Sequence, residues 1–105
     1  MYLEDLYSEF LEYMKSEKDA SKLTIEAYKR DFNISLDFLA INKIEPNLSN
    51  MRTPIIRKYI YYMNSVKKYT STTLCRRINS LRSFFKFVLS QEYIDKNPMN
   101  PITTP

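Results

Sequence analysis

The hydrophobic residues of Tyr69–Glu92 recur at steps of three and four along the chain. At 100° per residue this spacing gathers them on one side of a helix, and that side must be buried. Thr70 is placed to cap the helix, because its hydroxyl can accept from the amides of the next turn, so we predict a start at Ser71. The predicted buried stripe consists of Leu74, Ile78, Leu81, Phe85, Val88 and Leu89.

The opposite side of the same helix carries hydrogen-bond donors and positive charge, with no carboxylate among them. Its first turn also offers free amides and the positive end of the helix dipole, which attract anions. The pattern therefore indicates a helix that is half core and half a surface for phosphate and bases. The residues on this side are Thr72, Arg76, Asn79, Ser80, Ser83 and Lys86.

Two further amphipathic helices are predicted in the first part of the chain. Tyr2 to about Glu17 has a continuous apolar stripe, and Lys22 to Ala40 follows after the break EKDAS. Ser21 can cap the second of these helices, with Thr24 at its third position. The predicted inward residues are Leu3, Leu6, Tyr7, Phe10, Leu11 and Met14 in one helix, and Ile25, Tyr28, Phe32, Ser35, Leu36 and Leu39 in the other.

A shorter third helix is predicted from roughly Pro54 to Ser65, with Thr53 before it as the start signal. Proline in a first turn loses no hydrogen bond and presets φ. After Ser90 the chain reads QEYIDKNPMNPITTP, in which three prolines exclude a regular helix. In the third helix we expect Ile56, Tyr59, Ile60 and Met63 to be buried and Arg57, Lys58, Tyr61 and Tyr62 to face outward.

The composition supports an all-α fold and argues against catalysis. The 105 residues suffice for one domain, 44% of them are apolar, and there is no glycine for hairpins or a phosphate loop. Histidine is absent and Cys75 is the single cysteine, so the usual general base, a structural zinc site and an internal disulfide are all excluded. We expect no catalytic residue, no metal and no cofactor. Without a membrane span or signal peptide, we expect a cytoplasmic protein.

Charge is distributed unevenly along the chain. Between Pro46 and Gln91 there are nine Lys or Arg residues and no Asp or Glu, whereas residues 1–20 contain six acids and two lysines. Such an asymmetry orients a protein on a polyanion, although basic faces are also found as plain solvated surface. Lys67 and Lys68, in the loop before the last helix, could touch phosphate without reading sequence.

Three motifs in order resemble the amino-terminal core-binding domain of tyrosine recombinases, the family of phage integrases and Xer-type recombinases. The first is Ser-x-x-Thr-x-x-x-Tyr-x-x-Asp-Phe, from Ser21 to Phe32. The second is Thr-x-x-Thr-x-x-Arg-x-Ile-x-x-Leu-Arg-x-Phe, from Thr70 to Phe84, and the third is Tyr-Ile-x-x-Asn-Pro, from Tyr93 to Pro98. The resemblance covers nearly the whole length, from Leu3 to Ile102.

The resemblance implies a compact four-helix SAM-like orthogonal bundle in residues 1–97, with residues 98–105 a linker toward a catalytic domain that this chain lacks. In the family, the amino ends of the second and fourth helices clamp double-stranded DNA. The implied partners are duplex DNA, the carboxy-terminal catalytic domain and other protomers, with no membrane. The DNA-contacting residues expected here are Lys22, Thr24, Lys29, Arg30, Thr72, Thr73, Arg76, Arg77, Ser80 and Ser83.

The sequence departs from the family pattern at two places. No glycine precedes Ser21, and Glu26 puts an acid in the expected contact zone, where it would repel phosphate or accept from a cytosine amino group. A second function stays open on these data: a helical protein-interaction domain that uses the acidic first helix and the aromatic residues Tyr61, Tyr62 and Phe87. Arg82 is expected to contact the DNA backbone or to be plain surface.

Overall fold

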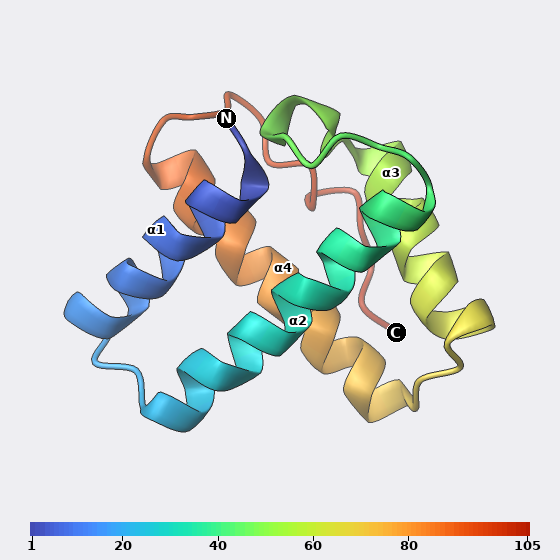
Figure 1. Cartoon of the computed structure of the whole chain (residues 1–105), viewed down its shortest axis with the longest axis horizontal. Coiled ribbons are helices and arrows are strands. Elements are labelled where there is room, and N and C mark those ends of the chain that lie inside the picture. Colours follow the sequence, from blue (N-terminus) through green and yellow to red (C-terminus); the bar gives the residue numbers. More distant parts are fainter. The chain divides into compact units, whose positions relative to one another are not determined.

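The computed structural model describes every residue from Met1 to Pro105 and contains no strand, so the predicted all-α fold is confirmed. Its helices are α1 (Leu3–Ser16), α2 (Lys22–Ile41), α3 (Thr53–Tyr61) and α4 (Ser71–Ser90) (Figure 1). A 3₁₀ turn, η1 (Leu48–Asn50), precedes α3, and a π-helical turn, η2 (Tyr62–Val66), follows it. The chain divides into two compact units, a first unit of residues 1–48 and a second unit of residues 49–105.

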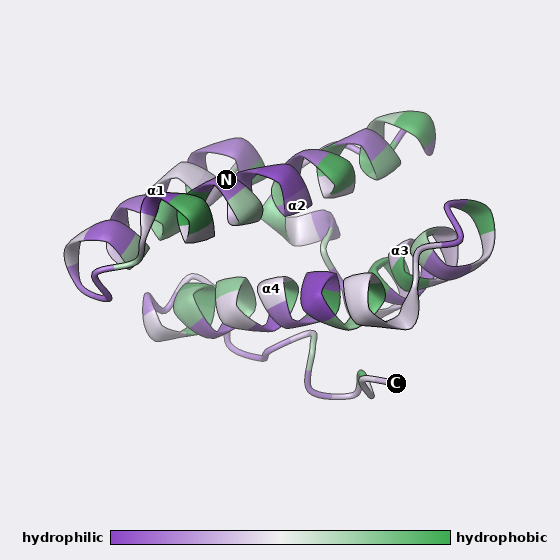
Figure 2. Ribbon diagram, turned by 90° about the horizontal axis from the view of Figure 1, so that it is seen from below, coloured by the Kyte–Doolittle hydropathy of each residue, from purple (hydrophilic) through white to green (hydrophobic).

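Aromatic side chains form the core of the first unit. Tyr7 of α1 stacks on Phe32 of α2 with ring centroids 4.0 Å apart, and Phe10 meets Tyr28 edge-on at 5.1 Å. Both geometries suit the quadrupoles of the rings. All twelve residues predicted to face inward from these two helices are buried or half-buried, and Figure 2 shows hydrophobic and hydrophilic positions alternating along the ribbons as the periodicity requires.

The start of α1 is held by the connector that follows α2. The Leu3 amide donates to the Pro46 carbonyl at 2.8 Å, and the Leu48 amide donates to the Met1 carbonyl at 2.8 Å. Tyr2 forms an isolated antiparallel bridge with Asn47 and stays extended, so α1 begins one residue later than predicted. A chain segment distant in sequence thus caps a helix that lacks a side-chain cap of its own.

The second unit buries most of its predicted stripes, with three differences. Ile56, Tyr59 and Met63 are buried as predicted, and so are five of the six stripe residues of α4. Phe84, which the stripe omitted, is fully buried, and Phe87 is only 5% exposed, whereas Leu89 is 37% exposed. The buried side of α4 is therefore wider than one helical stripe, and Phe87 belongs to the core and not to an exposed interface.

Helix α3 begins one residue before the predicted Pro54 and gives way after Tyr61 to the π-helical turn η2, which reaches Val66, next to the predicted end at Ser65. Thr53 is the first residue of α3, and its hydroxyl donates to the Pro98 carbonyl at 2.8 Å; Pro54 lies in the first turn, as expected. After Tyr61 the helix widens into η2, where the Lys67 amide donates to the Tyr62 carbonyl five residues back at 2.9 Å. None of the helices has the length and hydropathy needed to cross a lipid bilayer.

Candidate nucleic-acid interface

Helices α2 and α4 start with the same capping arrangement. The amide of Thr24 donates to Ser21 Oγ at 3.2 Å, and Ser21 Oγ donates to Thr24 Oγ1 at 3.0 Å. In α4 the amide of Thr73 donates to Thr70 Oγ1 at 3.3 Å, and the two hydroxyl oxygens lie 3.1 Å apart. Both predicted caps are confirmed. Because the Thr24 hydroxyl accepts in this bond, its own hydrogen can still be donated to an anion.

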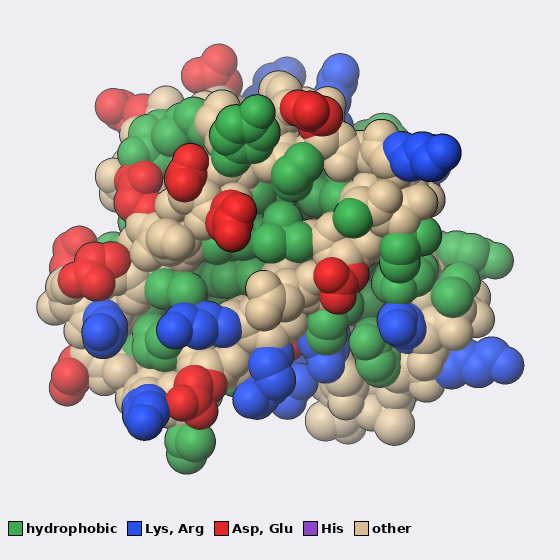
Figure 3. Space-filling view, viewed as in Figure 1, with side chains coloured by type: hydrophobic (Ala, Val, Ile, Leu, Met, Phe, Trp, Pro, Cys, Tyr) green, Lys and Arg blue, Asp and Glu red, His purple; other side chains and the backbone are tan.

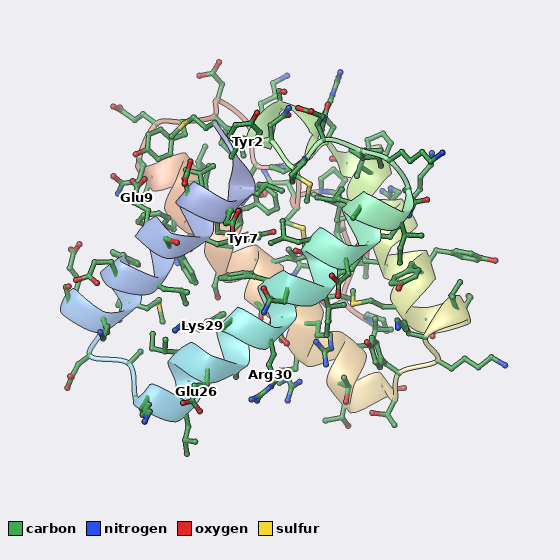
Figure 4. All side chains as sticks on the ribbon, in the orientation of Figure 1. Tyr2, Tyr7, Glu9, Glu26, Lys29 and Arg30 are labelled. Atoms are coloured by element: carbon green, nitrogen blue, oxygen red, sulfur yellow. The ribbon has the colours of Figure 1, made fainter.

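The basic residues of α2 lie along its amino-terminal half, in the first unit. Lys22, Thr24, Lys29 and Arg30 are all exposed, while Glu26 is half-buried among them. Figure 4 shows Lys29 and Arg30 leaving opposite sides of the ribbon, with Glu26 one turn earlier on the same half of the helix. The cations of α2 therefore bracket one acid, and this half of the helix is not uniformly positive.

The corresponding residues of α4, in the second unit, differ in accessibility. Thr72 and Arg76 are exposed, and Thr73, Arg77 and Ser83 are half-buried. The most accessible predicted contacts on α4 thus lie in its first two turns.

Ser80, the remaining predicted contact on α4, is 7% exposed, and its hydroxyl donates to the Arg76 carbonyl at 3.1 Å. A serine whose hydroxyl donates to a carbonyl of its own helix cannot donate the same hydrogen to DNA. We therefore leave Ser80 out of the proposed interface.

An aromatic ring lies beneath the guanidinium of Arg77, a contact that the sequence did not predict. The guanidinium carbon of Arg77 is 4.7 Å from the ring centroid of Tyr69, the residue before the cap. This is within the range of a cation–π contact, which holds a guanidinium without neutralising it. No local sequence pattern indicates this contact. Tyr69 precedes α4 and Arg77 lies in its second turn, so the two side chains meet only because of how the chain enters the helix.

Arg82 was expected to contact the DNA backbone or to be plain surface. In the structure it is half-buried, and its side chain hydrogen-bonds other residues of the second unit. Its guanidinium donates to the carbonyl of Ile102 at 2.6 Å and to Thr104 Oγ1 at 2.9 and 3.1 Å. Its third nitrogen lies 3.4 Å from the carbonyl of Met99. The hydrogen-bond donors of Arg82 are therefore engaged by residues of its own unit, although Arg82 lies on the same helix as Arg76.

The two units have formal net charges of opposite sign. The first unit contains ten acids and six Lys or Arg residues, a net −4, and the second contains two acids and ten Lys or Arg residues, a net +8. Figure 3 shows acidic side chains gathered over α1, where Glu4, Asp5, Glu9 and Glu12 are exposed. A polyanion is attracted to the second unit and repelled by this side of α1.

The pocket found in the first unit is small and has no catalytic constellation. It has a volume of about 220 Å³ and lies between α1 and α2, with Glu4, Ser8, Lys29 and Asn33 among its polar lining residues. Burial raises the pKa of Tyr7, on its wall, to about 12, although the hydrogen bond with Ser35 acts in the opposite direction. No group of three or more His, Cys, Asp or Glu side chains is arranged so that it could hold a metal ion.

Residues 7–92 match the family described as phage integrase, N-terminal SAM-like domain. A tyrosine recombinase XerC from Anoxybacillus flavithermus is 32% identical over 89 residues, covering 85% of this chain and 29% of that protein. A tyrosine recombinase XerD from Staphylococcus epidermidis is 33% identical over 100 residues, covering 95% of this chain and 33% of that protein. No solved structure matches the chain.

The chain spans about a third of the length of the curated relatives it matches. The family match covers most of the sequence, from α1 to the end of α4. The resemblance stated from the three sequence motifs is therefore confirmed, and the chain belongs to the family of phage-integrase N-terminal SAM-like domains.

Proposed function

We propose that this domain binds duplex DNA as the amino-terminal module of a site-specific tyrosine recombinase. The exposed first turns of α4 and the basic half of α2 contact phosphates and groove edges. In the whole protein, a separate catalytic domain cleaves the DNA, and other protomers complete the recombination complex. The names of the relatives support the recombinase assignment, since each is called a tyrosine recombinase.

The observation that carries the DNA-binding proposal is the start of α4. Thr72 and Arg76 are exposed directly after a capped helix start, within a unit of net charge +8. Amides and dipole at the start of a helix attract an anion, and the arginine fork adds paired donors for a phosphate or a guanine edge. On this basis Arg76 is the residue expected to contribute most.

The salt dependence of binding tests this proposal. Duplex DNA affinity, measured by fluorescence anisotropy across a salt series, should fall as salt rises, because phosphate contacts release counterions. Arg76→Ala should weaken binding and reduce the slope of log affinity against log salt by roughly 0.9, the value for one phosphate contact. If Arg76 reads a base instead, the loss should be about 1–3 kcal/mol and restricted to particular sequences.

Lys15→Ala is the matched control, because it removes one exposed cation from the acidic α1. It should leave the salt slope of wild type unchanged. An Arg76→Ala domain with wild-type affinity and slope on every duplex would contradict the assigned interface. The alternative function, a protein-interaction domain, predicts that result. Its acidic α1 and its Tyr61, which is 67% exposed, are accessible, whereas Phe87 is buried in the core.

A further inference from the structure

Residues 98–105, here called the C-terminal strap, fold back along the second unit after α4 ends. The Ile102 amide donates to the Met99 carbonyl at 2.9 Å, and the Met99 amide donates to Asn97 Oδ1 at 2.9 Å, which forms a closed turn. Met99 is 1% exposed and Ile102 is 6% exposed. A proline-rich end without helix thus has two anchored apolar side chains.

The carbonyls of all three strap prolines accept from side chains of the same unit. Pro98 accepts from the Thr53 hydroxyl at 2.8 Å, Pro101 accepts from Arg57 at 3.4 Å, and Pro105 lies 3.2 Å from Cys75 Sγ. Proline has no amide hydrogen, so a segment rich in it cannot satisfy its carbonyls by forming helix or sheet. Donors from α3 and α4 supply these partners instead.

Arg82 makes the shortest hydrogen bond to the strap and the largest number of them. Its guanidinium reaches two carbonyls and one hydroxyl of the strap, at 2.6–3.4 Å. Charge-assisted bonds in the fixed fork of an arginine are stronger and more directional than those between neutral groups. Because Arg82 contacts residues on both sides of Pro101, it holds the strap at more than one point.

We infer that the strap is an integral part of the second unit, that Arg82 is its anchor, and that Arg82 is for this reason withheld from DNA. The cations of α4 then have separate tasks: Arg76 remains exposed for an anion, whereas Arg82 fixes the path of the chain from Pro98 to Pro105. The strap runs back from the end of α4 toward Cys75, near its start, so the position of Pro105 is set by α4.

Amide hydrogen exchange measured by NMR on the whole chain tests the anchor. In Arg82→Ala, exchange at the Met99 and Ile102 amides should become roughly ten-fold faster, because charge-assisted bonds that oppose local opening are lost. Thr104→Val removes the hydroxyl that accepts from Arg82 while keeping charge and shape, and should accelerate the same two amides. Amides in the middle of α4 should exchange as in wild type in both variants.

Arg76→Ala is the matched control, since it removes an exposed arginine from the same helix; exchange at Met99 and Ile102 should not change. If Arg82→Ala fails to fold, as judged by circular dichroism, Thr104→Val decides the question alone. Unchanged exchange at both amides in the folded variants would overturn the inference.

A second measurement concerns DNA and depends on the proposed function. Arg82→Ala should leave the slope of log affinity against log salt unchanged, whereas a phosphate contact predicts a reduction of roughly 0.9. A reduction as large as that of Arg76→Ala would overturn the claim that Arg82 is withheld from DNA. If the domain binds no DNA at all, the proposed function fails, but the exchange measurement still decides whether Arg82 anchors the strap.

Discussion

The Tyr7 hydroxyl lies 2.9 Å from Ser35 Oγ in the core of the first unit. Ser35 Oγ donates its single hydrogen to the Phe32 carbonyl at 2.6 Å, so the proton between the two hydroxyls comes from Tyr7. A phenolate at this position would lose its solvation by water, and this cost outweighs the hydrogen bond with Ser35, which acts in the opposite direction. Burial therefore raises the pKa of Tyr7 to about 12, and the neutral side chain is built into the fold.

This raised pKa predicts a loss of stability in alkali. The folded state keeps its proton up to a higher pH than the unfolded chain, whose tyrosines titrate near 10, so the contribution is complete below about pH 10 and is lost as pH rises toward 12. At about pH 11 the loss from Tyr7 should be on the order of 1 kcal/mol. Urea unfolding at pH 9 and 11 should show a smaller alkaline loss in Tyr7→Phe than in wild type, and an identical loss would contradict this assignment.

At the scale of single elements, the helix ends show how a chain without glycine stops its helices. Lys43 follows α2 with φ 55° and Glu92 follows α4 with φ 62°. After α2, the Lys43 amide donates to the Ala40 carbonyl and the Ile44 amide donates to the Leu39 carbonyl, which is the Schellman pattern usually built on glycine. A side chain at positive φ crowds the backbone, so these ends carry local strain.

Lys43→Gly should therefore stabilise the domain. Glycine removes the strain at positive φ, and the gain should be about 0.5–1 kcal/mol after the larger entropy of the unfolded glycine chain is counted. The midpoint of urea unfolding at neutral pH measures the effect. Lys43→Ala keeps a Cβ at the same exposed position and is the control; an equal gain there would mean that loss of the lysine charge, and not backbone strain, is responsible.

At the scale of the whole molecule, the difference in net charge between the two units determines which of them we expect to attract DNA. The second unit has a net charge of +8 and the first a net −4, with four exposed acids on α1. Electrostatic attraction to a polyanion is therefore expected at the second unit, and within the first unit it is expected only at the basic half of α2.

Titration of the labelled domain with duplex DNA should move amide resonances unevenly. We expect the largest shifts at Ser71–Arg77 in α4, smaller shifts at Lys22–Arg30 in α2, and almost none along the acidic side of α1. Charge repulsion keeps phosphate away from α1, and raising the salt should reduce all the shifts together. Shifts concentrated on α1 would contradict the proposed interface and favour an interaction through the acidic helix.

Much of the local structure followed from the sequence alone. Residue periodicity and capping side chains act within one or two helical turns, so the spans of α2 and α4 and the caps at Ser21 and Thr70 were predicted to within a residue. The family could also be recognised, because its motifs are read from the order of residues along the chain. The exposed part of the candidate interface, such as Thr72 and Arg76, follows from the same helical periodicity.

Other features were decided only by tertiary structure, because their partners are far apart in sequence. The Thr53 hydroxyl bonds the Pro98 carbonyl, 45 residues away, and Arg82, expected to contact the DNA backbone or to be plain surface, hydrogen-bonds residues of the strap. Phe87 became core because the buried side of α4 is wider than one stripe. A sequence pattern determines which faces a helix offers, but which donor meets which carbonyl depends on how the chain folds back on itself.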